Sequence, residues 1–235
     1  TEKASSGGAV VADSPLPFTS NTSIKNPYSY HPEKAKQILE KAGWTDPDKD
    51  GIRNKKSAAK SSKVPQELRF RLVTSDWPDL IKTAELIQKD LREVGIDLTI
   101  ESKTLSELEQ TAIKPREFEI LLFGQVYSFE ADPFSFWHSS QIKDPGLNIS
   151  LYSSKKADRI MEDTRKLNNP AGKDKKHEDL ASVLLEDLPA VFLYNQLYIY
   201  LLPGHLRGVE LGKISLPSDR FNAVNKWYMD TKRVW

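Results

Sequence analysis

The sequence predicts an α/β fold, because segments with the period of a β-strand alternate along the chain with segments that have the period of an α-helix. The clearest example is the stretch 68–100, where a strand pattern, a helix pattern and a second strand pattern follow one another. A continuous apolar run at 120–123 adds a strand of the kind that is buried on both faces of a sheet. We expect irregular chain over residues 1–30 and a single α/β lobe over residues 31–235, with a mixed sheet flanked by helices.

The first helix is expected just after His31. Pro32 suits the first helical turn, and Gly43 provides a C-terminal stop. Trp44 follows the stop and is expected to fold back onto the apolar face of the helix. That face consists of Ala35, Ile38, Leu39 and Ala42.

A βαβ unit is predicted next. In its first strand, Leu68, Phe70 and Leu72 alternate with two arginines, which is the pattern of a strand with one solvated face. Pro78 opens a helix with apolar residues at helical spacing, and Gly95 ends it before a second alternating strand. Two strands joined by such a crossover are expected to be parallel.

The remaining elements continue the alternation. A helix is expected over 105–113, and the strand at 120–123 is expected at the centre of the sheet. Apolar residues at helical spacing indicate two more helices, within 160–167 and 180–188.

A β-hairpin is expected after the last helix. Its strands are the apolar segments 190–194 and 197–202, and its turn is expected at Asn195 and Gln196.

Composition excludes several classes of function. The 34 basic and 33 acidic residues give a formal net charge of +1, so charge provides no reason to expect a nucleic acid as partner. The absence of cysteine excludes thiol catalysis, thiolate metal sites and disulfides. No run of 18 apolar residues indicates a membrane span, and the segment TEKASSGG lacks the pattern of a signal peptide, so an export signal is expected outside this chain.

Several short sequence segments occur in the order typical of one protein family. They are YHPEKAKQILEKAGW, DKDGIR, AELIQKDLREVGIDLTI, FEILLFG, ADPFSFWHSSQ, GLNISLYSS and LEDLPAVFLYNQLYIYLLPGHLRGV, followed by RFNAVNKWYMD. From about residue 26 to residue 235 the chain resembles the second half of the family 5 extracellular solute-binding proteins. The resemblance implies one lobe of the type II periplasmic-binding-protein fold, cut from its first lobe.

The same resemblance implies a function. Members of this family hold a small molecule or oligopeptide between two lobes and deliver it to an ABC permease in the membrane. The chain is therefore expected to be extracytoplasmic, to belong to a membrane-anchored protein, and to act without a cofactor and without enzymatic activity.

The loop after the strand at 120–123 is the first candidate for ligand contact, because open α/β sheets bind ligands at the carboxyl ends of their strands. Gln125, Tyr127 and Phe129 are expected to face the ligand cleft. The loop also contains Phe134, Phe136 and Trp137, which are expected instead to pack a short helix that is capped by Asp132 and begun by Pro133.

Peptide binders of the family often carry a Gly-Trp pair in this loop, followed by an Asp that holds the ligand's α-ammonium group. This sequence has Gln125 at the expected Trp position and no Asp at the second position, so the resemblance is weaker for peptides with free N-termini. Asn148 and Tyr152 are also expected near the surface between the lobes. Two interpretations of this pair stay open, since Asn148 could instead satisfy its own loop and Tyr152 could pack at a helix entrance.

A weak calcium candidate is formed by Asp46, Asp48 and Asp50, which precede a glycine as in the first half of a calcium-binding loop. Ser57 stands where such a loop needs a bidentate Glu, so we expect weak calcium binding or none. The four histidines show no zinc-ligand spacing, and no metal site is otherwise expected.

Two alternative functions stay open. One is a sensor or scaffold lobe without a transport role. The other is a carboxylate-dependent α/β hydrolase, which would need two acids in one pocket. The sequence offers only the acid pairs Glu107 with Glu109 and Glu117 with Glu119, for which solvated positions are the ordinary explanation.

Overall fold

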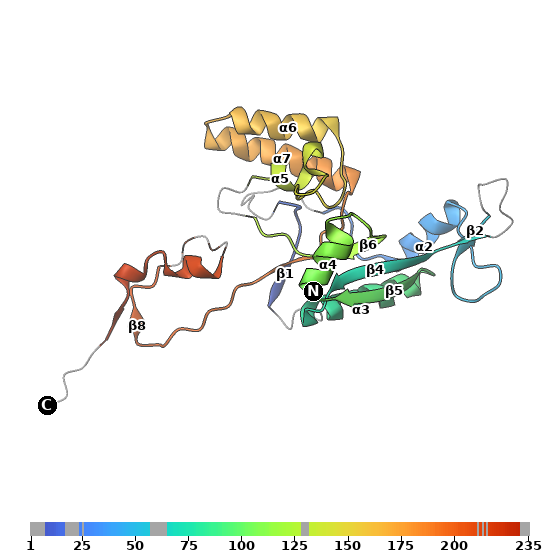
Figure 1. Cartoon of the computed structure of the whole chain (residues 1–235), viewed down its shortest axis with the longest axis horizontal. Coiled ribbons are helices and arrows are strands. Elements are labelled where there is room, and N and C mark those ends of the chain that lie inside the picture. Colours follow the sequence, from blue (N-terminus) through green and yellow to red (C-terminus); the bar gives the residue numbers. More distant parts are fainter. Residues whose placement is uncertain are drawn as a thin grey trace. The chain divides into compact units, whose positions relative to one another are not determined.

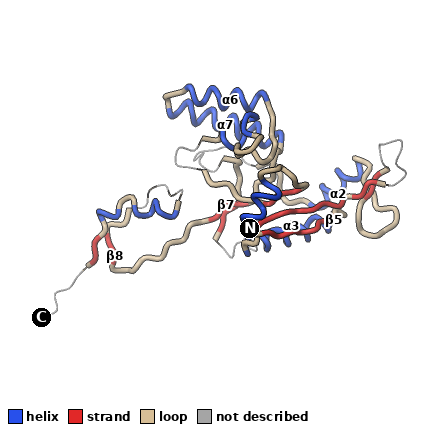
Figure 2. Tube along the Cα trace, viewed as in Figure 1, coloured by secondary structure: helices blue, strands red, loops and turns tan. Residues whose placement is uncertain are grey.

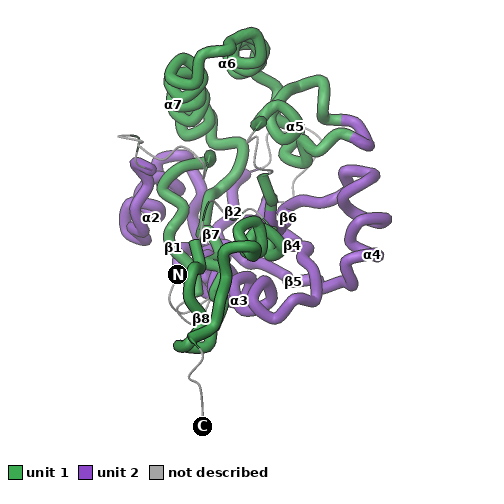
Figure 3. Tube along the Cα trace, turned by 90° about the vertical axis from the view of Figure 1, so that its left-hand side faces the viewer, with its two compact units in different colours: residues 1–25, 125–142, 146–235 green, residues 26–124, 143–145 purple. Residues whose placement is uncertain are grey.

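The structure is a computed structural model that describes residues 8–16, 24, 26–56, 65–127, 132–210, 212, 214 and 216–230. The chain divides into two compact units, shown in Figure 3. Unit 1 comprises residues 1–25, 125–142 and 146–235, and unit 2 comprises residues 26–124 and 143–145. The expectation of one lobe over residues 31–235 stays a prediction.

Unit 2 contains a three-stranded parallel sheet. Its strands are β4 (Arg69–Ser75), β5 (Asp97–Lys103) and β6 (Ile120–Leu122), in the order β5-β4-β6. Helix α3 (Pro78–Glu93) connects β4 to β5, and the strands pair from Arg69 with Asp97 to Ser75 with Lys103. The predicted βαβ unit is therefore confirmed, and the arrows of β4 and β5 point the same way in Figure 1.

Strand β6 lies at an edge of this sheet, so the expectation that it lies at the centre is wrong. The central strand is β4, whose last four residues are all at most 5% exposed. In β6 only Leu122 is buried, while Ile120 and Leu121 are half-buried. A continuous apolar run shows that both faces of a strand are covered, but it does not show whether both of its edges are paired. The expected mixed sheet is instead this parallel sheet together with separate antiparallel pairs.

Unit 2 also contains two further helical segments and a short pair of strands. Helix α2 (Pro32–Lys41) begins and ends close to the expected positions, although none of its residues is buried and Ile38 is 57% exposed. Helix α4 (Leu105–Leu108) begins with a capping box between Thr104 and Glu107 and continues as a π-helical turn, Glu109–Ile113. Strands β2 (Asn54–Lys55) and β3 (Gln66–Glu67) form a short antiparallel pair.

Arg53 ties three segments of unit 2 together. Its Nε donates to the Val94 carbonyl at 2.8 Å, and its Nη1 donates to the Trp44 carbonyl at 2.9 Å. Its Nη2 donates to Glu40 at 3.1 Å, and the side chain is only 11% exposed. The residue thus connects the ends of α2 and α3 to the loop before β2. Gly95 lies against it, because a Cβ at that position would be 2.7 Å from the Arg53 Cγ.

Unit 1 is built around a helical layer. Helices α5 (Phe134–Trp137), α6 (Lys155–Lys166) and α7 (Pro170–Asp187) pack on one another, and α6 and α7 lie side by side in Figures 1 and 3. The predicted short helix at Phe134 is confirmed, with the Asp132 Oδ1 accepting a hydrogen bond from the Phe134 N–H at 3.0 Å. The core residues of the layer are Leu16, Trp137, Tyr152, Ala157, Met161, Leu180, Ala181, Val183 and Leu184.

The strands of unit 1 differ from the expectation. Strand β7 (Tyr194–Gln196) includes the two residues predicted as a hairpin turn, and it pairs antiparallel with β1 (Ala9–Val11). The hairpin prediction is therefore wrong, and residues 1–30 are not irregular throughout. A partner almost 200 residues away in the chain leaves no local signal, so the pattern around Asn195 favoured the nearer partner.

Short elements complete unit 1, and Figure 2 shows them by type. Strands β8 (Leu206–Arg207) and β9 (Tyr228–Met229) pair antiparallel, and three short 3-10 helices are described at Ser139–Gln141, Pro217–Phe221 and Val224–Lys226. Within the described ranges, none of the helices is both long and apolar enough to cross a membrane.

We predict that Gly95→Ala destabilises the protein, because Gly95 has φ +88° and a Cβ would collide with the Arg53 side chain. A loss of about 2 kcal/mol in the free energy of unfolding is expected, measured by urea denaturation. The matched control is Gly124→Ala, since a Cβ at Gly124 meets no atom within 4 Å. Equal stability of the two variants would contradict the packing role of Gly95.

Candidate functional site

The carboxyl ends of β4 and β6 meet at one edge of the parallel sheet. Thr74 pairs with Leu122 in the register, so Asp76 and Trp77 follow one strand end while Phe123 follows the other. Ligands of open α/β sheets bind outside the carboxyl ends of the strands. This edge is therefore the candidate functional site within unit 2.

Exposed and buried groups are sharply separated at this edge. Thr74 is fully buried, and its hydroxyl donates to the Leu122 carbonyl at 2.8 Å, which holds the two strand ends together. Beyond them, Trp77 is 62% exposed and Phe123 is 37% exposed. Two aromatic side chains are thus presented to solvent on a fixed strand edge, an arrangement suited to contact with a ligand.

Asp76 and Trp77 were missed in the sequence analysis. The carboxyl-end rule was applied there only to the strand at 120–123, whereas the same rule applied to the strand that begins near Leu68 leads to both residues. The signal was present, since an Asp and a Trp directly follow the strand and precede the helix opened by Pro78.

Of the expected ligand residues, Gln125 is exposed and directly follows Gly124, where the chain passes from unit 2 to unit 1. Tyr127 is half-buried and is tied to the core of unit 1. Its hydroxyl accepts a hydrogen bond from the Trp137 Nε1 at 2.8 Å, and its ring meets Phe136 edge-on with 4.8 Å between centroids. Burial raises the pKa of the Tyr127 hydroxyl above its ordinary value.

Phe129, the third residue expected in this loop, lies outside the described residues. The expectation that the following aromatic residues pack a short helix is confirmed for Trp137, which is 1% exposed in the core of unit 1. Ligand contact by Gln125, Tyr127 and Phe129 stays a prediction.

Asn148 is fully buried and holds its own loop. Its Nδ2 donates to the carbonyls of His138 and Tyr152 at 3.1 and 2.8 Å, and its Oδ1 accepts from the Tyr152 N–H at 3.1 Å. The Ser150 hydroxyl donates to the same oxygen at 3.1 Å. All of the amide's main hydrogen-bonding positions are therefore used within the loop.

Tyr152 is also in the interior, at 9% exposure, and its ring meets Trp137 edge-on. Its hydroxyl donates to Asp187 at the end of α7, at 2.5 Å. Burial, reinforced by this hydrogen bond, raises the pKa of Tyr152 to about 12. Both side chains thus have structural roles in unit 1, and the expectation that they contact a ligand stays a prediction.

The calcium candidate does bring its carboxylates together. Oxygens of Asp46, Asp48 and Asp50 lie within 4.8 Å of one another, and no other such group of three or more His, Cys, Asp or Glu is found among the described residues. The Asp46 Oδ2 accepts a hydrogen bond from the Gly51 N–H at 3.0 Å, and the Asp50 Oδ1 accepts one from the Ile52 N–H at 2.8 Å. Local turn contacts therefore account for much of the cluster.

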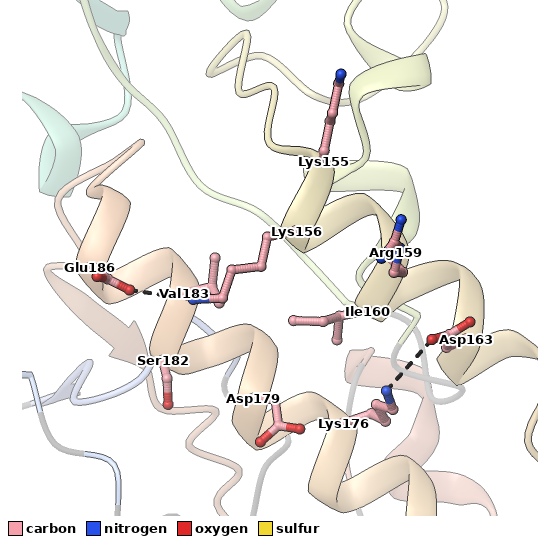
Figure 4. A pocket seen from close by; sticks show the side chains of 10 residues that line it. All are labelled: Lys155, Lys156, Arg159, Ile160, Asp163, Lys176, Asp179, Ser182, Val183 and Glu186. Atoms are coloured by element: carbon pink, nitrogen blue, oxygen red, sulfur yellow. Dashed lines mark ion pairs between the residues drawn. The ribbon is translucent and has the colours of Figure 1, made fainter.

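A groove of about 610 Å³ runs between α6 and α7 of unit 1 and is shown in Figure 4. Ion pairs cross it twice, from Lys156 to Glu186 and from Lys176 to Asp163, each at 3.6 Å. Ile160 points into the groove from α6. Because these opposite charges already pair with one another, the groove offers less to a ligand than the sheet edge of unit 2 does.

Three of the four acids that the hydrolase alternative would need have local partners for their side chains. Glu107 accepts hydrogen bonds from Thr104 in the capping box, which lowers the pKa of its carboxyl group. Glu119 accepts from the Arg71 N–H at 2.7 Å, and Glu109 pairs with Lys114 at 3.1 Å. These contacts give the acids structural roles.

Comparison with known proteins shows which family has this architecture. The model of the bacterial extracellular solute-binding proteins, family 5, matches residues 1–145. The chain belongs to this family. The α/β fold expected from the sequence is confirmed, and it is the fold of extracellular solute-binding proteins.

Two curated proteins are similar to all or part of the chain. The oligopeptide-binding protein AppA of Bacillus subtilis is 29% identical over 224 residues, which cover 94% of this chain and 39% of AppA. The nickel-binding periplasmic protein of Escherichia coli is 32% identical over 120 residues, which cover 49% of this chain and 20% of that protein.

Solved structures agree with the family. The structure of Bacillus subtilis AppA in complex with a nonapeptide has a TM-score of 0.75 and 27% identity, covering 98% of this chain and 44% of AppA. NikZ of Campylobacter jejuni in complex with Ni(L-His) has a TM-score of 0.67 at 24% identity over 94% of this chain and 43% of NikZ, which supports the fold alone. The chain thus spans less than half the length of these relatives.

We predict that Asn148→Ala costs about 3 kcal/mol in the free energy of unfolding, because it leaves buried backbone groups of the 138–152 loop without partners. Thermal and urea denaturation would measure the loss. Asn222→Ala on the exposed surface is the control and should be nearly neutral. A nearly neutral Asn148→Ala would refute the loop-holding role.

We predict that the Asp46, Asp48 and Asp50 cluster binds calcium more weakly than micromolar, since part of its oxygen set is used by turn N–H groups. Calorimetric titration of the apoprotein with calcium would measure the affinity. Micromolar binding that disappears in Asp48→Asn would contradict the prediction.

Proposed function

We propose that this chain is part of the substrate-binding component of an ABC importer of the peptide and nickel class. It would hold an oligopeptide or another small polar solute in a cleft that a second lobe completes. The observation that carries the proposal is the similarity to AppA, an oligopeptide-binding protein, over 94% of the chain. Membership in a family of solute-binding proteins supports the same class of function.

The second lobe is supported by an exposed apolar segment of unit 1. Ile199 and Leu201 are 68% and 87% exposed, and neighbouring residues 197, 198 and 200 are between 39% and 47% exposed. Such a run of adjacent apolar side chains normally lies against other protein. Because this chain spans 39% of the length of AppA, the rest of a longer protein is the natural partner for this segment.

The remaining parts of the proposal follow from the class. Closure of two lobes around a solute creates the form that a membrane permease recognises, so the permease is the proposed macromolecular partner. The protein would act outside the cytoplasm, held at the membrane, and would bind its solute without catalysing a reaction. Neither a cofactor nor a nucleic acid has a part in this function.

The proposal predicts shared binding by two lobes. Each lobe alone buries one side of the solute, and hydrogen bonds gain strength only when water is excluded. The two-lobed protein should therefore bind at least about a thousandfold more tightly than this chain, which corresponds to about 4 kcal/mol. Calorimetry with a nonapeptide and with a nickel–histidine complex as probes would measure the difference.

Native mass spectrometry of the two-lobed protein would first show whether a small molecule copurifies with it, and that molecule becomes a third probe. Equal affinities of the chain and the two-lobed protein would place the whole site within this chain and overturn the shared cleft. Failure of the two-lobed protein to bind any of the three probes would overturn solute binding itself.

A further inference from the structure

We propose that Asp76 and Trp77 form a subsite for a positively charged organic group of the solute. The inference rests on the proposed solute-binding function and goes beyond it by naming a chemical class. It assigns recognition to the segment between β4 and α3, which the sequence analysis had not considered.

The Asp76 carboxylate has no structural task in the part of the chain that the structure describes. It is exposed, and it makes no hydrogen bond or ion pair with the described residues. It does not cap α3, because the N-cap is Trp77 and no side chain bonds there. The main-chain bonds of that first turn run from the N–H groups of Leu80 and Ile81 to the Trp77 carbonyl. An acid without a partner on a ligand-binding edge is available to a cation from solution.

The cation that ends the neighbouring strand is already engaged. Lys103 ends β5 beside Ser75, and its Nζ pairs with Glu101 at 3.0 Å and donates to Thr111 at 2.9 Å. Its backbone carbonyl nevertheless accepts from the Asp76 N–H at 2.8 Å. The neighbouring strand therefore fixes the position of the Asp76 backbone without neutralising its carboxylate.

Trp77 supplies the second half of the subsite. An indole that is 62% exposed is unusual, because tryptophan is highly buried on average. The face of an indole attracts ammonium and guanidinium groups, and this attraction grows when water is excluded. A carboxylate followed directly by an exposed indole thus fits the charged end of an amine or guanidine, with its carbon chain against the ring.

Rigid supports make the arrangement preorganised. Thr74 and Ser75 are 0% and 5% exposed, and Pro78 fixes the start of α3 directly after Trp77. Phe123 lies at the adjacent strand end and is also exposed, so it extends the apolar rim. Little backbone conformational entropy has to be lost when a ligand binds to such an edge.

The test compares Asp76→Asn with Glu85→Gln in the two-lobed protein. Glu85 is an exposed acid on α3 without a described partner, so its variant removes the same charge from the same helix. Calorimetry would use two nonapeptides of equal length, one with a free amino terminus and a lysine side chain, and one acetylated with the lysine replaced by norleucine.

We expect Asp76→Asn to weaken binding of the cationic peptide about tenfold or more while leaving the neutral peptide unchanged, and Glu85→Gln to change neither. Trp77→Leu should weaken the cationic peptide more than Trp77→Phe, which keeps an aromatic face. A loss that is equal for both peptides, or a loss of thermal stability without a change in affinity, would overturn the subsite and leave Asp76 a structural role at the start of α3.

A second readout separates this inference from the proposed function. If the wild-type protein binds neither peptide, solute binding of the peptide class fails, and lysinamide is then titrated while tryptophan fluorescence is followed. Saturable quenching that is lost in Asp76→Asn supports the subsite, whereas identical quenching in wild type and Asp76→Asn overturns it.

Discussion

The parallel pairing of β4 with a strand on each side is the constraint on which unit 2 depends. Helix α3 returns the chain so that β5 runs in the same direction as β4, and β6 joins the other side in the same sense. All three strands therefore end at one edge. The burial of Leu72 and Val73 gives this arrangement its apolar stabilisation, and the edge receives its exposed side chains from the residues that come next.

Unit 1 is organised by a buried polar side chain within an apolar layer. Asn148 provides the hydrogen bonds that a buried loop cannot obtain from regular secondary structure, and it holds the chain between α5 and α6 in place. Trp137 then packs between the rings of Tyr152 and Phe192. The segment GLNISLYSS, which contains Asn148, thus has a structural explanation that is independent of any ligand.

Membership in the family of extracellular solute-binding proteins relates the sheet edge of unit 2 and the Asn148 network of unit 1 to one function. A solute-binding lobe needs a rigid edge on which a ligand can rest, and it needs loops that keep their shape when the ligand is absent. Under the proposed function, the edge at Asp76 and Trp77 would provide the first, and the network around Asn148 would provide the second. The exposed segment that contains Ile199 and Leu201 adds an apolar surface of the kind that normally lies against other protein.

The sequence by itself determined the α/β class, the βαβ unit, the boundaries of α2 and α3 and the short helix at Phe134, because helix and strand periods, prolines and glycines act locally. It also led to the family, since short characteristic segments in the right order can be recognised even where overall identity is low. Only the tertiary structure decided that β4 rather than β6 is central, and that Asn195 lies in a strand paired with β1, because strand partners are chosen by contacts between distant segments. The same limit applied to the site: Asn148, Tyr152 and Trp77 are all polar or amphipathic residues beside regular elements, and burial alone separates the first two from the third. Burial depends on everything that packs around a side chain, which no local pattern contains.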